Sequence, residues 1–178
     1  LRHLPLQPEP SATGGISMCP SMNSRVRMPS KLVKLKLIAA AHGFRFSATL
    51  GLLNLIWEAA QIPFYTIWHD GTWSEIVFAV AHCTVGDVLI GIFSATGAVF
   101  LAGMQWPRDP RTSLIFTGYF IGFGLSYTVF SEWLNVAVRK SWAYSTLMPV
   151  IPPLDTGLLP VLQWVVVPML ALWLNRRN

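Results

Sequence analysis

The chain has 178 residues, of which 53% are hydrophobic and only 12% are charged. Soluble domains carry roughly 25% charged residues, so this composition argues against a water-soluble fold and predicts an integral membrane protein. The net charge of +5 comes without a nucleic-acid recognition motif, and its basic residues flank apolar segments. We therefore expect the lipid bilayer, and no nucleic acid, as a partner.

Residues 1–30 are rich in Pro, Ser, Gly and Met and show no apolar period, which predicts a disordered tail. An alternative start at Met22 or Met28 would shorten it, so the tail need not be translated in full. Residues 31–178 form the predicted membrane domain.

Four apolar segments follow, near the length of about 20 residues that a helix needs to cross a bilayer. The predicted spans are residues 44–67, 75–104, 113–134 and 158–174. They predict an all-α protein, a four-transmembrane-helix bundle. In the last span Pro160 lies near the helix start, where its missing N–H is harmless, and Pro168 is expected to kink the helix.

The distribution of Lys and Arg predicts the orientation. The flank before the first span is strongly basic, whereas the loop of residues 68–74 has no Lys or Arg. Positive residues favour the cytoplasmic side, so we expect both termini in the cytoplasm and a multi-pass protein of the plasma membrane. Arg139 and Lys140 in the third loop oppose this pattern but are outnumbered by the N-terminal basic residues.

The third loop, residues 135–157, contains Trp142, Tyr144 and several prolines, which excludes a regular helix throughout. Its aromatic residues leave two alternatives open, an anchor in the membrane interface or a lid over a site.

Small residues at fourfold spacing predict close helix contacts. Gly118 and Gly122, continued by Ser126, form one such row, and Ser94, Ala98 and Ala102 form another. Contact within the chain and a homo-oligomer or membrane partner held through Gly118 and Gly122 both remain open.

Ionisable residues inside the apolar segments predict a polar site, because a charge in hydrocarbon costs at least about 2.5 kcal/mol. Asn54, Glu58 and Gln61 share one face of the first span. On the second span, His82 and Asp87 are about 140° apart around the helix.

Glu132 and Asn135 share a face near the outer end of the third span. The predicted topology places all these groups in the middle to outer half of the bilayer. Three helices thus bring polar groups to one depth, which predicts a shared polar cluster between them.

The candidate catalytic residues, which are also the candidate metal ligands, are Glu58, His82, Asp87 and Glu132. The candidate ligand-binding or supporting residues are Asn54, Gln61, Asn135, Trp142 and Tyr144. A metal or acid–base site, a proton path, a ligand site and purely structural helix contacts all remain open, and the sequence identifies no cofactor. The helical ligand pairs HExxH and ExxH are absent from the sequence, which weakens the metal interpretation.

Four segments carry a family resemblance: WEAAQIPFYTIW (57–68), HCTVGD (82–87), YTVFSEWLN (127–135) and WAYSTLMP (142–149). Together they resemble a family of small bacterial inner-membrane proteins. The resemblance covers about residues 45–175 and implies a bacterial plasma membrane, but it implies no activity and no catalytic residues.

We therefore expect a small integral membrane protein with a buried His/Glu/Asp cluster in the outer half of the bilayer. One alternative is a membrane-embedded enzyme, with or without a metal, that acts on a lipid or isoprenoid. The other is proton- or ion-coupled transport, or a role as an accessory subunit.

Overall fold

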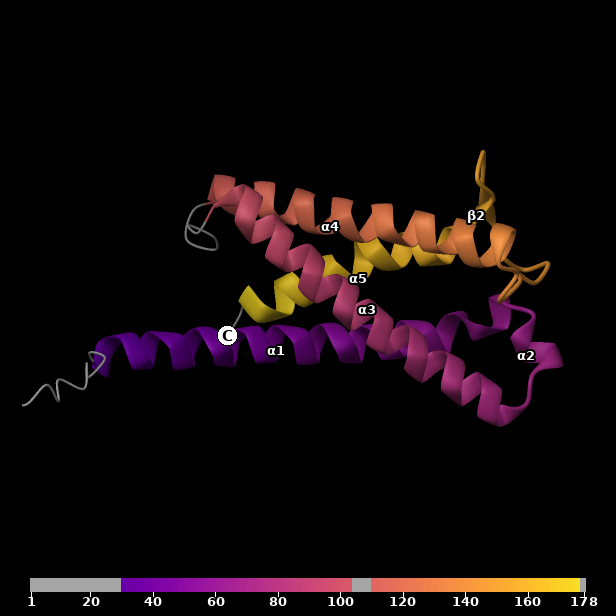
Figure 1. Ribbon diagram of the computed structural model, residues 1–178, viewed down its shortest axis with the longest axis horizontal. Coiled ribbons are helices and arrows are strands. Elements are labelled where there is room, and N and C mark those ends of the chain that lie inside the picture. The colour runs from indigo at the N-terminus through magenta and orange to yellow at the C-terminus, as the bar shows by residue number, and fades with distance from the viewer. Residues whose placement is uncertain (1–29, 104–109, 177–178) are drawn as a thin grey trace, which may run out of the picture.

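The structure is a computed structural model that describes residues 30–103 and 110–176, so the predicted N-terminal tail lies outside the described residues. Most of the described chain is helical (Figure 1). The α-helices are α1 Ser30–Gln61, α2 Ile67–Asp70, α3 Trp73–Ala102, α4 Pro110–Glu132 and α5 Leu158–Arg176. A 3-10 helix, η1 Ile62–Phe64, follows α1, and a π-helix, η2 Trp133–Val138, continues α4.

The four long helices run back and forth between two ends of the molecule (Figure 1). One end carries α2 and residues 139–157 and is called the loop end below. The start of α1 and the end of α5 lie toward the opposite end, which is called the terminal end.

Local sequence explains where the helices begin and end. The Thr72 side chain accepts a hydrogen bond from the Glu75 N–H at 3.4 Å, and the Glu75 carboxylate accepts one from the Thr72 N–H at 2.7 Å. This reciprocal capping box starts α3. Gly103 ends the helix with a φ of 88°, a conformation that is strained for any residue with a Cβ.

Three helices are long and apolar enough to cross a membrane, namely Trp73–Ala102, Pro110–Val138 and Leu158–Asn175. The prediction of a mostly helical protein is therefore confirmed, and three of its helices could cross a membrane. The third predicted span was too short at its end, because η2 extends the helix to Val138 and places Asn135 in it rather than in a loop. The first predicted span extends too far at its end, because α1 ends at Gln61 and residues 62–66 form η1 and the connection to α2. Helix α1 is not one of these three helices.

The distribution of side chains is the reverse of that in a soluble protein. Large apolar side chains face outward, with Phe100 87% and Phe93 73% exposed. Buried polar side chains occur instead between the helices and include Asn54, Glu58, Gln61, Gln163 and Glu132. Lipid can cover the first group but cannot satisfy the second, so this arrangement suits a protein surrounded by hydrocarbon.

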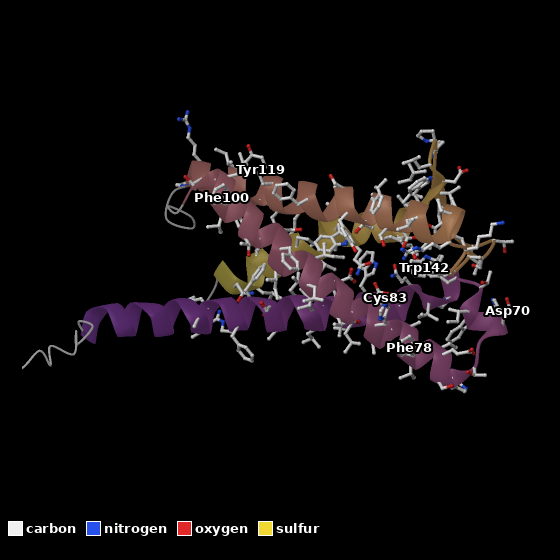
Figure 2. All side chains as sticks on the ribbon, in the orientation of Figure 1. Asp70, Phe78, Cys83, Phe100, Tyr119 and Trp142 are labelled. Atoms are coloured by element: carbon white, nitrogen blue, oxygen red, sulfur yellow. The ribbon has the colours of Figure 1, made fainter. Side chains whose placement is uncertain are left out.

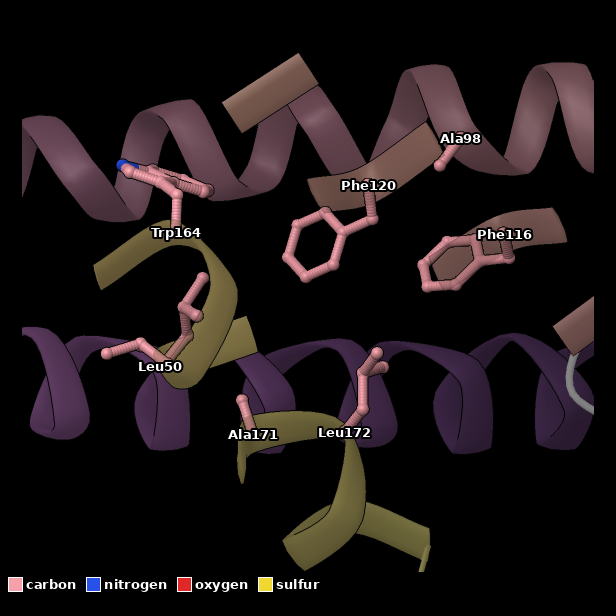
Figure 3. Packing of buried hydrophobic residues seen from close by; sticks show 8 residues of the cluster. Leu50, Ala98, Phe116, Phe120, Trp164, Ala171 and Leu172 are labelled. Atoms are coloured by element: carbon pink, nitrogen blue, oxygen red, sulfur yellow. The ribbon is translucent and has the colours of Figure 1, made fainter. Parts of the chain in front are cut away.

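An apolar core fills the bundle between the polar residues and the terminal end (Figure 3). It consists of Leu50, Ala98, Phe116, Phe120, Trp164, Val167, Ala171 and Leu172. Two glycines allow its large side chains to fit. A Cβ at Gly91 would collide with Leu50, and a Cβ at Gly124 would collide with the Trp164 ring.

The two predicted rows of small residues differ in whether they pack against a neighbouring helix. Ser94 and Ala98 are buried between helices, in agreement with close packing. A Cβ at Gly118 or Gly122 would meet nothing within 4 Å, so the contact of this row is not within the described chain. On α4 it is Gly124 that gives the close approach, because it lies on the buried face with Phe116, Phe120 and Thr128.

The third loop contains a two-stranded antiparallel hairpin, β1 Val150–Ile151 with β2 Thr156–Gly157. Exposed apolar side chains surround its turn, namely Leu147, Val150, Ile151 and Leu154. The earlier part of the loop is tied to η1, because the Thr66 N–H donates to the Ala143 carbonyl at 3.0 Å and the Ser145 N–H to the Phe64 carbonyl at 2.9 Å.

Candidate functional site

A cavity of about 770 Å³ lies in the bundle at the loop end. Its walls come from α1, α3, η1, α4, η2, the start of α5 and residues 139–142. All four predicted ionisable residues line it, namely Glu58, His82, Asp87 and Glu132. Figure 2 shows Phe78, Cys83 and Trp142, which also line it, toward the loop end, and Phe100 toward the terminal end.

Helix α1 supplies one polar wall. Leu50, Asn54 and Glu58 follow one another at fourfold spacing, so they share the face that α1 turns into the bundle. Asn54 is only 2% exposed and Glu58 only 6%. Gln61 is also buried, and its side-chain oxygen accepts a hydrogen bond from the Trp57 indole N–H at 3.1 Å.

Gln163 on α5 is the centre of the polar cluster. Its Nε2 donates to Asn54 Oδ1 at 3.0 Å, to Glu58 Oε1 at 3.0 Å and to Asp87 Oδ2 at 2.7 Å. Three helices are therefore joined through one nitrogen. We call Asn54, Glu58, Asp87 and Gln163 the amide–carboxyl cluster.

Sequence reasoning missed Gln163, although a signal was present. It is the one amide in the otherwise apolar residues 158–174. The same argument that selected Asn54 on the first span would have selected it, because lipid cannot satisfy an amide.

The amide–carboxyl cluster has few donors for its acceptors. An amide NH₂ has two hydrogens, so it cannot give each of three oxygens a full hydrogen bond. Glu58 and Asp87 share this donor, and the two acceptor oxygens therefore lie within about 6 Å of each other.

One hydrogen-bond donor of the cluster has no acceptor in the described part of the chain. Asn54 Nδ2 is buried and has no hydrogen-bond partner among the described residues. Buried amide groups are normally paired, so the cluster is not a fully satisfied structural network.

Glu132 forms a second polar group on the same cavity. The Tyr144 hydroxyl donates to Glu132 Oε2 and accepts from the Gly157 N–H at 2.9 Å. Burial, and then the hydrogen bond to Glu132, raise the pKa of Tyr144, so this hydroxyl keeps its proton at neutral pH. Tyr65 and Trp142 also direct polar groups toward Glu132, although the Trp142 N–H does not reach hydrogen-bond geometry.

His82 and Asn135 lie at the margin of the cavity. His82 is exposed and stacks on Phe78, with ring centroids 5.5 Å apart and planes at 17°. The Asn135 amide donates to the Ser131 carbonyl one turn earlier, at 2.9 Å. These two candidates therefore belong to the wall rather than to the amide–carboxyl cluster.

The candidate metal ligands do not gather into one cluster in the described part of the chain. Across residues 30–103 and 110–176, no three His, Cys, Asp or Glu side chains lie close enough to hold a metal ion. His82 projects from a different part of α3 than Asp87, as expected for residues five apart.

An apolar groove adjoins the cavity. The groove has a volume of about 580 Å³ and runs along α3 and α4, where it is lined by Gly86, Leu89, Ile90, Phe93, Ser94, Gly97, Phe123 and Tyr127. Gly86, Ile90 and Tyr127 line both spaces. Leu89, Phe93 and Tyr127 are exposed, so the groove opens on the outer face of the bundle.

Comparison of the chain with models of protein families, with curated proteins and with solved structures finds no match.

Proposed function

We propose that this membrane protein binds an amphiphilic molecule that enters sideways from the lipid. The polar head occupies the cavity beside the amide–carboxyl cluster, and the apolar chain lies in the α3–α4 groove. The observation that carries this proposal is that the cavity and the groove share Gly86, Ile90 and Tyr127 in their walls. A cavity that holds polar side chains beside an apolar, lipid-facing groove matches a molecule with a head and a tail.

The proposal includes α1 as a fourth membrane helix. Its polar residues Asn54 and Glu58 face the bundle, whereas Leu52 and Ile56 are exposed, at 59% and 58%. Part of its low hydropathy therefore comes from residues that lipid would not touch. With the basic N-terminal flank in the cytoplasm, the loop end and its cavity belong to the outer half of the plasma membrane.

The core argues for a binding site rather than a conduit. A conduit needs polar groups from one face to the other. Between the amide–carboxyl cluster and the terminal end, the described helices are closed by Leu50, Phe116, Phe120 and Trp164. A pathway through such a dry layer is costly for an ion.

A photocrosslinking experiment tests the proposal. A long-chain alcohol that carries a diazirine on its chain is added to the full-length protein in lipid nanodiscs, and labelled peptides are identified by mass spectrometry. We expect labels on the α3 and α4 peptides that line the groove.

The Gly86→Leu variant supplies the sharper test. A Cβ at Gly86 meets nothing within 4 Å, so the larger side chain fits the fold but fills the junction of cavity and groove. Gly43→Leu is the matched control, because Gly43 is equally open and lies on α1 away from the groove. Labelling should fall several-fold in Gly86→Leu alone. Labels spread evenly over the lipid-facing surface, or equal in both variants, would refute the proposal.

A further inference from the structure

We infer that the head of the bound amphiphile carries a positive charge with N–H donors, that is, a primary amine or a related ammonium group. This inference rests on the proposed function and names the chemical class of the ligand.

The first argument is the shortage of donors in the amide–carboxyl cluster. Two carboxyl groups offer about eight lone-pair sites, and Gln163 supplies two hydrogens that it also shares with Asn54. Glu58 and Asp87 both line the cavity, so a ligand there can reach them. An ammonium group supplies three donors, and a hydroxyl supplies one.

The second argument is the charge of the cavity wall. Its acidic residues come from three helices and are Glu58 on α1, Glu75 and Asp87 on α3, and Glu132 on α4. Its basic residues are Arg139, beyond the end of η2, and His82, and both are exposed. Glu75 is exposed as well, whereas Glu58 and Glu132 are buried and Asp87 is half-buried, so the deep part of the cavity is acidic and its basic residues lie at the rim.

Two of these acids already have dedicated donors. Glu75 accepts hydrogen bonds from the Thr72 N–H and hydroxyl at the start of α3. Glu132 accepts from Tyr144. Glu58 and Asp87 remain as the pair that a cation would compensate, because carboxylates this close repel each other.

The third argument is the aromatic lining. Tyr65, Phe78, Tyr127, Trp142 and Trp164 all contribute to the wall. Aromatic faces attract ammonium groups, most strongly where water is excluded. Acidic and aromatic residues together thus favour an organic cation over a neutral or anionic head.

The test compares two probes of equal chain length, a long-chain primary amine and the corresponding alcohol. Each competes with the photocrosslinking alcohol for full-length protein in zwitterionic nanodiscs, and empty nanodiscs correct for partitioning into lipid. We expect the amine to bind wild-type protein about tenfold more tightly than the alcohol, which is the range of one charge-assisted hydrogen bond.

Substitutions then test whether Glu58 and Asp87 cause the tighter binding of the amine. Asp87→Asn and Glu58→Gln should each bring the two probes to similar affinity. Asp70→Asn is the matched control, because Asp70 is an exposed carboxylate that does not line the cavity. The Asp70→Asn variant should prefer the amine over the alcohol as strongly as the wild-type protein does.

The outcomes separate the two proposals. If neither probe competes with the label in wild-type protein, the proposed function itself fails. Equal binding of amine and alcohol to wild type would leave the amphiphile site standing and overturn the cationic head. A preference for the amine that survives both Asp87→Asn and Glu58→Gln would also overturn it. The wild-type comparison decides the question even if a variant does not fold.

Discussion

At the scale of single residues, the polar cluster depends on Gln163, because one nitrogen serves acceptors on α1 and α3. Gln163→Leu would leave two buried carboxyl groups and the Asn54 carbonyl without this donor. An unsatisfied buried polar group costs about 1–3 kcal/mol, so we expect the free energy of unfolding to fall by at least that amount.

Denaturation in mixed micelles measures this loss, with Gln61→Leu as the control. Gln61 is also buried but accepts one hydrogen bond, from Trp57, so its substitution should cost about 0.5–1.5 kcal/mol. A Gln163→Leu variant as stable as Gln61→Leu would show that the cluster does not hold the helices together.

Two glycines on α4 give a second prediction at this scale. Gly124→Ala places a methyl group against the Trp164 ring, and such overpacking costs about 1–3 kcal/mol. The helix propensity of Ala offsets about 1 kcal/mol of it. Gly118→Ala is the matched control on the same helix, where the methyl group meets nothing. We expect a lower Tm for Gly124→Ala and an equal or higher Tm for Gly118→Ala. The opposite order would contradict the packing of α4 on α5.

The same residues show how far the sequence alone could go. The spacing of Asn54, Glu58 and Gln61 defined the buried face of α1, because periodicity records which way a side chain points. Residue spacing could not show which glycine of α4 packs against a neighbouring helix. Gly118 and Gly122 have the more familiar spacing, but Gly124 contacts Trp164 because helix rotation is set by the large side chains around it.

At the scale of elements, the third loop has one part against the cavity and one part that projects from the bundle. Trp142 lines the cavity, and Tyr144 is half-buried against Glu132. The hairpin beyond them exposes Val150 and Ile151. Composition could not predict where one part ends and the other begins, because that boundary depends on contacts with η1 and α4, which are distant in sequence.

Tyr144 gives a prediction for this loop. Tyr144→Phe removes the hydroxyl that joins Glu132 to the Gly157 N–H. The loop should then open more often, and hydrogen exchange of residues 143–157 should become several-fold faster. Tyr127→Phe is the control, because Tyr127 lines the cavity mouth on α4 and lies outside the loop. Unchanged exchange in Tyr144→Phe would mean that the contacts with η1 alone hold the loop.

At the scale of the whole molecule, the polar residues gather toward the loop end and the apolar core extends toward the terminal end. This asymmetry follows from the topology. Glu58 lies near the end of α1, Asp87 near the middle of α3, Glu132 at the end of α4 and Gln163 near the start of α5. Alternating helix directions bring these positions to similar depths, and the sequence could predict that convergence for three of the four helices.

The orientation of α1 is the last prediction. If α1 crosses the membrane, its start and the loop end lie on opposite sides. Cysteines are introduced singly at Ala41, His69 and Asp155, all of them exposed, after Cys19 and Cys83 are replaced by Ser. A membrane-impermeant maleimide is then added to intact cells and to inverted vesicles.

We expect His69→Cys and Asp155→Cys to react in intact cells and Ala41→Cys to react in inverted vesicles, because the basic flank of α1 favours the cytoplasm. If all three react from one side, α1 lies along the membrane surface. Glu58 and Asn54 would then be anchored near water rather than within the bilayer. The cost of burying polar groups in hydrocarbon is the physical reason for regarding the amide–carboxyl cluster as a site. If α1 lay on the membrane surface, that cost would largely disappear.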